Sequence, residues 1–95
     1  GVAFERFMAI LIINSGSSSL KFALLEGEEF LAEGLFERLG RPEARAKWKI
    51  HDQTGTADYP DAKHAEALAA MVALLGNELG RPLPVEAVGH RVVHG

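Results

Sequence analysis

Hydrophobic and polar positions alternate along much of the first 60 residues and then change to helical spacing. Residues 9–13 are a continuous apolar run, which is typical of a strand covered on both faces. Residues 20–26 alternate, with Leu20, Phe22 and Leu24 on one face. The tight turn between these two segments predicts that they pair antiparallel. The same alternation predicts further strands at residues 30–39, 44–51 and 56–59.

Two features of these later strands lead to specific predictions. Gly34 lies inside the third apolar segment, where it predicts a bulge. The basic residues Arg45, Lys47 and Lys49 share one face of the fourth segment, which we interpret as a solvated edge. Trp48, on the other face, is expected to pack in the core.

A helix is predicted over residues 61–79, where an apolar stripe recurs at helical spacing: Ala65, Leu68, Val72, Leu75 and Leu79. Asp61 is expected to cap its start, and Gly80 followed by Pro82 to end it. Residues 85–94 return to strand character. The sequence therefore predicts an α/β (α+β) domain, in which an antiparallel meander is followed by a helix and one more strand.

The segment from Asn14 to Lys21 is the strongest candidate for chemistry. Backbone N–H groups in a Gly/Ser turn can converge on an anion, hydroxyls add donors, and a lysine supplies a mobile charge. The segment is not a Walker A motif, because Leu20 stands where that motif needs a glycine before its lysine. An ordinary polar hairpin turn, with Lys21 as a solvated lysine, is the alternative from these residues alone.

Arg91 is the second candidate. It lies in a short apolar segment, and an arginine in such a setting needs an acidic or phosphate partner. A structural ion pair and a bound anion both satisfy this requirement. His90 and His94 are four residues apart, but without a third candidate ligand they do not predict a zinc site. His51 and His64 are expected at the surface.

Composition narrows the functional classes. The 95 residues carry a net charge of −3 and no basic block, which gives no support for a nucleic-acid partner. There is no cysteine, which excludes disulfides and thiolate chemistry and is compatible with a reducing compartment. No apolar run approaches the roughly 20 residues of a membrane span.

Two motifs resemble the acetate kinase family. They are Ile-Ile-Asn-Ser-Gly-Ser-Ser-Ser-Leu-Lys-Phe at residues 12–22 and Val-Gly-His-Arg-Val-Val-His-Gly at residues 88–95. The resemblance covers residues 8–95 but only about the first quarter of such an enzyme, so we read these residues as the N-terminal part of its first domain. We interpret residues 1–7 as additions ahead of a native start at Met8, with a native extension as the alternative.

The resemblance implies a ribonuclease-H-like half-domain of the acetate and sugar kinase, Hsp70 and actin superfamily. It implies phosphoryl transfer between ATP and acetate, giving acetyl phosphate and ADP, by a cytoplasmic and homodimeric complete enzyme. Gly16, Ser17, Ser19 and Lys21 would then contact ATP phosphates, and Asn14 would help to place Mg²⁺ through water. The same resemblance makes Arg91 the substrate-binding residue.

By the same resemblance, no catalytic residue lies within this segment, and the segment alone would be inactive. We expect neither a nucleic acid nor a membrane as a partner. Two alternatives remain open. One is a propionate kinase, which these motifs do not separate from an acetate kinase. The other is a non-catalytic module that binds phosphate or a partner protein.

Overall fold

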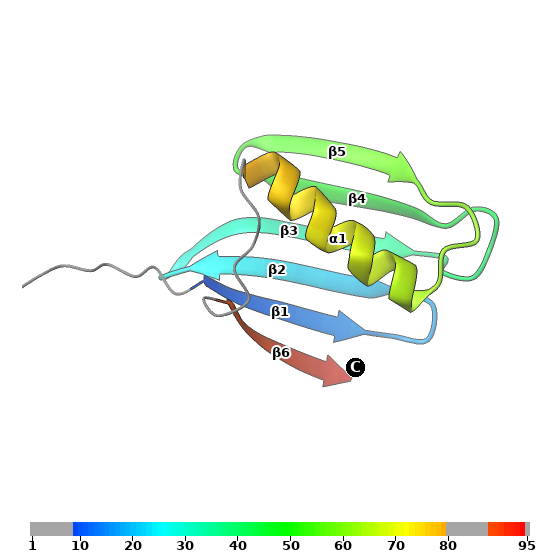
Figure 1. Ribbon diagram of the computed structural model, residues 1–95, viewed down its shortest axis with the longest axis horizontal. Coiled ribbons are helices and arrows are strands. Elements are labelled where there is room, and N and C mark those ends of the chain that lie inside the picture. The colour runs from blue at the N-terminus through cyan, green and yellow to red at the C-terminus, as the bar shows by residue number, and fades with distance from the viewer. Residues whose placement is uncertain (1–8, 80–87, 95) are drawn as a thin grey trace, which may run out of the picture.

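In the computed structural model, residues 9–79 and 88–94 are described, and they form six strands and one helix (Figure 1). The elements, in chain order, are β1 (Ala9–Ser15), β2 (Leu20–Glu26), β3 (Glu29–Glu37), β4 (Arg45–Ile50), β5 (Gln53–Asp58), α1 (His64–Leu79) and β6 (Val88–His94). Among these residues, no helix has the length and apolar character that crossing a lipid bilayer requires. The α/β half-domain that the sequence predicts is confirmed.

The strands form one sheet in the order β5-β4-β3-β2-β1-β6. Neighbouring strands from β1 to β5 are antiparallel, whereas β6 lies parallel to β1. The carboxyl ends of β1 and β6 therefore lie at the same edge of the sheet, beside the β1–β2 turn (Figure 1). In open α/β sheets, ligands bind outside the carboxyl ends of the strands.

One face of the sheet is covered by α1, which crosses it diagonally (Figure 1). The helix contributes Ala67, Met71 and Leu75, four residues apart and each 0% exposed, because this spacing keeps side chains on one face. The predicted apolar stripe is therefore wrong in part: Leu75 is buried, but Leu68 is 41% and Val72 45% exposed. Their apolar partners come from the alternating positions of the strands. The buried strand residues are Leu11, Ile13, Leu20, Phe22, Leu24, Ala32, Phe36, Ala46 and Ile50.

Two glycines on this covered face make room for aromatic rings. A Cβ on Gly55 would lie 2.6 Å from the Trp48 ring, and a Cβ on Gly34 would collide with the Phe22 ring. The prediction of a bulge at Gly34 is wrong, because Gly34 pairs in regular register with Phe22 on β2. The register shift lies between Leu24 and Leu25, nearer the other end of the strand. Gly34 serves close packing on a regular strand.

Several boundaries differ from those expected. The fifth strand begins at Gln53, earlier than predicted, because its residues complete the ladder with β4. The helix begins at His64, and the Lys63 N–H donates to the Glu66 carboxylate at 2.9 Å in place of the expected Asp61 cap. Asp61 has a φ of 62° and lies outside the helix. The predicted start of the last strand, residues 85–87, lies outside the described residues.

The face of the sheet opposite α1 is open. The prediction that residues 9–13 form a strand covered on both faces is therefore wrong, because Ile10 on β1 is 45% exposed. Arg45, Lys47 and Lys49 on this face belong to β4, which pairs with strands on both sides, so the expectation of a solvated edge is wrong: this is a solvated face. Glu37 lies 3.9 Å from Arg45 and 3.8 Å from Lys47, and such part-exposed pairs contribute little stability. Phe30 is exposed on the same face, opposite Leu25.

The glycine packing gives a test of the core. Gly34→Ala should lower the free energy of unfolding by about 1–3 kcal/mol, because its Cβ would overpack the Phe22 ring and lie 3.0 Å from the Lys47 carbonyl oxygen. Glu33→Ala is the control, because Glu33 is the neighbouring residue on the same strand and its side chain is exposed. Chemical denaturation of both variants measures the difference. Equal losses would mean that Gly34 has room for a methyl group.

Candidate functional site

The candidate site is built on the turn between β1 and β2. The last strand pair is Ser15 with Leu20, and the Gly16 N–H donates to the Ser19 carbonyl at 2.9 Å, which closes the turn. A Cβ on Gly16 would lie 2.8 Å from the Ser19 hydroxyl oxygen. Glycine at this position therefore allows the Ser19 side chain to lie against the backbone of the turn at Gly16.

Asn14 and Lys21 lie directly opposite each other, in the antiparallel pair next to the turn. Directly opposite residues share a face of the sheet, with Cβ atoms about 4.5–5.5 Å apart. Both side chains are exposed, and both are on the face opposite α1, since their neighbours Ile13 and Phe22 point into the core. The fold thus brings an amide and an ammonium group together beside the turn.

Three carbonyl oxygens of the turn, those of Gly16, Ser18 and Ser19, are hydrogen-bonded to other groups of the protein. The Ser18 carbonyl accepts from the Leu39 N–H at 2.9 Å. His64 Nε2 lies 2.7 Å from the Gly16 carbonyl oxygen and 3.2 Å from that of Ser19. Within the described part of the chain, the N–H groups of Ser17 and Ser18 donate to no backbone carbonyl. The turn therefore keeps N–H donors available while three of its carbonyl oxygens are bound.

The fold brings some of the predicted site residues together at the turn. Ser17 and Ser18 are exposed at the tip of the turn, and Ser19 is half-buried. Arg91 lies on β6, and its Cα pairs with that of Ile12 on β1, two residues before Asn14. The backbone register places Arg91 on the strand beside the one that carries Asn14.

His64 is the residue that the sequence analysis missed. It was expected at the surface, but it is half-buried under the turn, which lies 45 to 48 residues earlier in the chain. Its position at the start of a helical pattern gives no indication of such a contact. A hydrogen bond between two distant segments depends on how α1 packs across the sheet, which periodicity does not determine.

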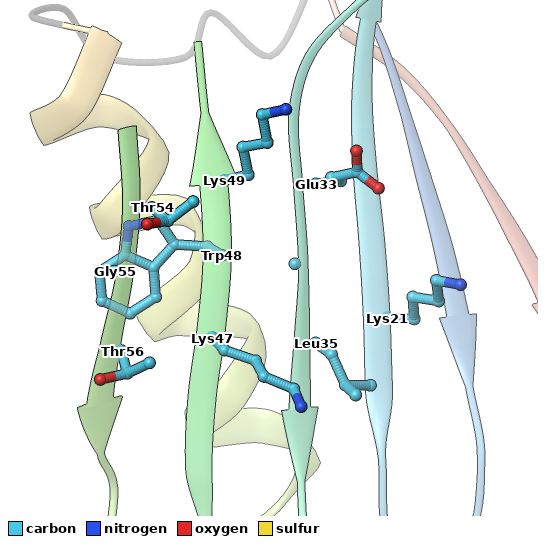
Figure 2. Close-up of a pocket in the computed structure, with 10 residues that line it drawn as sticks. Lys21, Glu33, Leu35, Lys47, Trp48, Lys49, Thr54, Gly55 and Thr56 are labelled. Carbon is cyan, nitrogen blue, oxygen red and sulfur yellow. The ribbon is translucent and has the colours of Figure 1, made fainter. Parts of the chain in front are cut away.

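A shallow hollow of about 670 Å³ lies on the open face of the sheet. Figure 2 shows its lining from β2 to β5, with α1 behind the sheet. Lys21 is at one side of it, and the other polar residues are Glu33, Lys47, Lys49, Thr54 and Thr56. Neither Asn14 nor residues 16–19 line the hollow. We therefore place the candidate site at the turn, where fixed donors and a lysine meet, with the hollow as an adjacent surface.

The described residues offer little for direct metal coordination. No group of three or more histidine, cysteine, aspartate or glutamate side chains comes together among them. Asn14 provides one neutral oxygen, and Lys21 directly opposite adds a positive charge. Mg²⁺ is usually held by carboxylates, phosphates and water. Among the described residues, the site therefore offers a neutral amide oxygen but no set of direct ligands for a magnesium ion.

Comparison with known proteins gives consistent matches. The model of the acetokinase family matches residues 9–95. The chain is 48% identical over 91 residues to an acetate kinase from Haemophilus influenzae. That alignment covers 90% of this chain and 22% of the relative. The chain therefore spans less than a quarter of the length of the curated relatives that it matches.

Solved structures match across the same region. The acetate kinase of Porphyromonas gingivalis superposes with a TM-score of 0.74 at 31% identity, covering 92% of this chain and 24% of that protein. A propionate kinase from Francisella tularensis superposes with a TM-score of 0.73 at 27% identity, covering 92% of this chain and 23% of that protein.

Proposed function

The chain belongs to the acetokinase family, and we propose that it is the N-terminal segment of an acetate kinase. The proposed reaction is reversible phosphoryl transfer between ATP and acetate, giving acetyl phosphate and ADP. One observation at the site supports this most: Asn14 and Lys21 lie side by side at a turn in which three carbonyl oxygens are bound by the protein. Such a turn presents donors and positive charge to an anion.

The turn is proposed to hold the ATP phosphates. Lys21 supplies a flexible positive charge for phosphate oxygens. Ser17 and Ser19 supply hydroxyl donors, and Gly16 allows close approach of the backbone. Phosphoryl transfer requires positioning and charge stabilisation more than covalent chemistry from the protein. A pre-formed turn of this kind supplies both.

Mg²⁺ is proposed to enter with the nucleotide. Bound to the phosphates, the ion would neutralise charge on their oxygens. Asn14 is placed to accept a hydrogen bond from the water shell of the ion, beside Lys21. We propose no inner-sphere ligand from the described residues.

Arg91 is proposed to bind the acyl substrate. A guanidinium group matches the geometry of a carboxylate or an acyl phosphate with two parallel hydrogen bonds. Its backbone position on β6, next to β1, is on the strand neighbouring Asn14. Phosphoryl transfer requires the acyl acceptor to lie near the bound nucleotide, and a position on the neighbouring strand meets this requirement.

The complete enzyme is proposed to be a cytoplasmic homodimer.

A propionate kinase is the second candidate, since one structure with a similar fold is a propionate kinase. The two substrates differ by one methylene, and such a difference is worth about 1–3 kcal/mol in an apolar pocket. The ratio of kcat/KM for acetate to that for propionate in the complete protein decides between the two. A ratio well below one would make propionate the substrate.

The 95-residue chain alone should have no kinase activity, because it spans less than a quarter of its relatives and the catalytic residues are proposed to lie elsewhere in the complete enzyme. An assay with ATP, Mg²⁺ and acetate, in which hydroxylamine traps acetyl phosphate, measures this. The complete protein is the positive control. Turnover of the chain alone in the ordinary enzyme range, roughly 1–10³ s⁻¹, would show that the segment holds a full active site.

Lys21→Ala in the complete protein should raise the KM for ATP by about 10- to 150-fold, because a charge-assisted hydrogen bond to phosphate is worth about 1.5–3 kcal/mol. Lys49→Ala is the matched control, because Lys49 is also exposed and lines the same hollow. It lies on β4, two strands away from Lys21 on β2. Steady-state kinetics with each substrate varied in turn measures both variants. If Lys21→Ala and Lys49→Ala behave alike, Lys21 is a solvated lysine of the open face.

Arg91→Ala in the complete protein should impair the kinetics of acetate and acetyl phosphate and leave ATP binding nearly unchanged. Turnover should fall by about 10²–10³-fold if the guanidinium also holds charge that develops during transfer. Arg91→Lys should recover little, because an ammonium group cannot make the two-pronged contact. Arg41→Ala, at an exposed arginine, is the control.

A structural ion pair predicts a different result for Arg91. Loss of a buried ion-pair partner lowers stability by about 3–5 kcal/mol, and both substrates would then be affected in proportion to the folded fraction. Thermal melts measured beside the kinetics separate the two roles. Early melting with a normal KM for acetate would assign Arg91 to structure.

A further inference from the structure

His64 connects the start of α1 to the β1–β2 turn. Its Nε2 atom lies 2.7 Å from the Gly16 carbonyl oxygen and 3.2 Å from the Ser19 carbonyl oxygen. Both partners are carbonyl oxygens, which only accept hydrogen bonds, so Nε2 carries the hydrogen and donates to both. One imidazole N–H group thus spans the two ends of the turn, with the shorter bond to Gly16.

His64 is held in place by the helix that it begins. His64 is the first residue of α1, and the preceding N–H group, that of Lys63, is capped by Glu66 at 2.9 Å. The helix is anchored in the core by Met71 and Leu75, both 0% exposed. The imidazole is therefore attached to a packed helix and not to a flexible loop.

The direction of these bonds matters for an anion site. The imidazole approaches the turn from the side of α1, whereas Asn14 and Lys21 lie on the opposite face of the sheet. A carbonyl dipole directed at a phosphate would repel it, whereas an N–H dipole attracts it. By binding the carbonyl oxygens of Gly16 and Ser19, His64 keeps their negative ends on the helix side.

We propose that His64 is a positioning residue, which holds the β1–β2 turn in the conformation that binds nucleotide phosphates. This inference rests on the proposed role of the turn in ATP binding. His64 does not touch the nucleotide in this arrangement; it acts through Gly16 and Ser19. The bond from the Leu39 N–H to the Ser18 carbonyl, at 2.9 Å, holds the tip of the turn independently. Loss of His64 should therefore loosen the turn without unfolding the hairpin.

The test compares three substitutions of His64 in the complete protein. His64→Ala removes the donor and should raise the KM for MgATP by about 5- to 30-fold, with the KM for acetate changed by less than about 2-fold. His64→Gln keeps an N–H donor at a similar reach and should recover most of the affinity. His64→Leu fills the volume without a donor and should behave as His64→Ala. It replaces His64→Ala if that variant does not fold.

His51→Asn is the matched control. His51 is exposed in the β4–β5 turn at a φ of 55°, a backbone conformation that asparagine tolerates, and should show unchanged kinetics. A merely structural role of His64 would reduce the amount of active enzyme and leave both KM values unchanged. Unchanged KM values, equal changes for both substrates, or a His64→Gln variant as impaired as His64→Leu would each overturn the proposal.

Lys21→Ala, measured in parallel, separates this inference from the proposed function. If Lys21→Ala weakens ATP use and the His64 variants do not, the turn binds phosphate without needing His64. If Lys21→Ala leaves the KM for ATP unchanged and a direct binding measurement detects no nucleotide at the turn, the proposed function itself is wrong. A raised KM for MgATP in both Lys21→Ala and His64→Leu, with recovery in His64→Gln, supports both.

Discussion

The register between β1 and β2 is the constraint on which the rest of this structure depends. It pairs Ile13 with Phe22 and Leu11 with Leu24, and all four side chains are buried beneath α1. Each such burial contributes about 1.5–3 kcal/mol. A slip of one residue would turn this set toward solvent and bury Lys21 instead, so the hydrophobic face specifies the register strongly. Asn14 and Lys21 lie opposite each other on the outer face as a direct consequence.

The covered face of the sheet also shapes the turn. α1 packs on this face through Ala67, Met71 and Leu75, and the same helix carries His64 to the turn. Backbone bonds add a second connection, since Leu39 donates to Ser18 and Gly40 donates to the Ala62 carbonyl just ahead of the helix. Core packing and the conformation of the proposed phosphate-binding turn are therefore physically coupled. A helix that shifted on the sheet would move the donor that holds the turn.

Aromatic packing fixes the other half of the sheet. Phe36 lies 6.2 Å from Phe22 and 5.5 Å from Tyr59, measured between ring centroids in tilted pairs, which are worth about 0.5–1.5 kcal/mol each beyond burial. Phe22 and Trp48 occupy space that Gly34 and Gly55 leave free on the neighbouring strands. Alternation predicted that Phe22 and Trp48 each lie on the apolar face of their strand. It did not predict that the glycines would remain in regular register, because a glycine inside a strand is equally compatible with a bulge.

The sequence by itself determined the order of the elements, the buried faces of β2 and β4, and the turn that carries the candidate chemistry, because each follows from local spacing of side chains. The two motifs also determined the family, which the comparisons confirm. Only the tertiary structure decided that β4 is an inner strand and that His64 reaches the turn. These features depend on how strands and helix meet across long stretches of chain, where the geometry of packing and not local periodicity selects the partner.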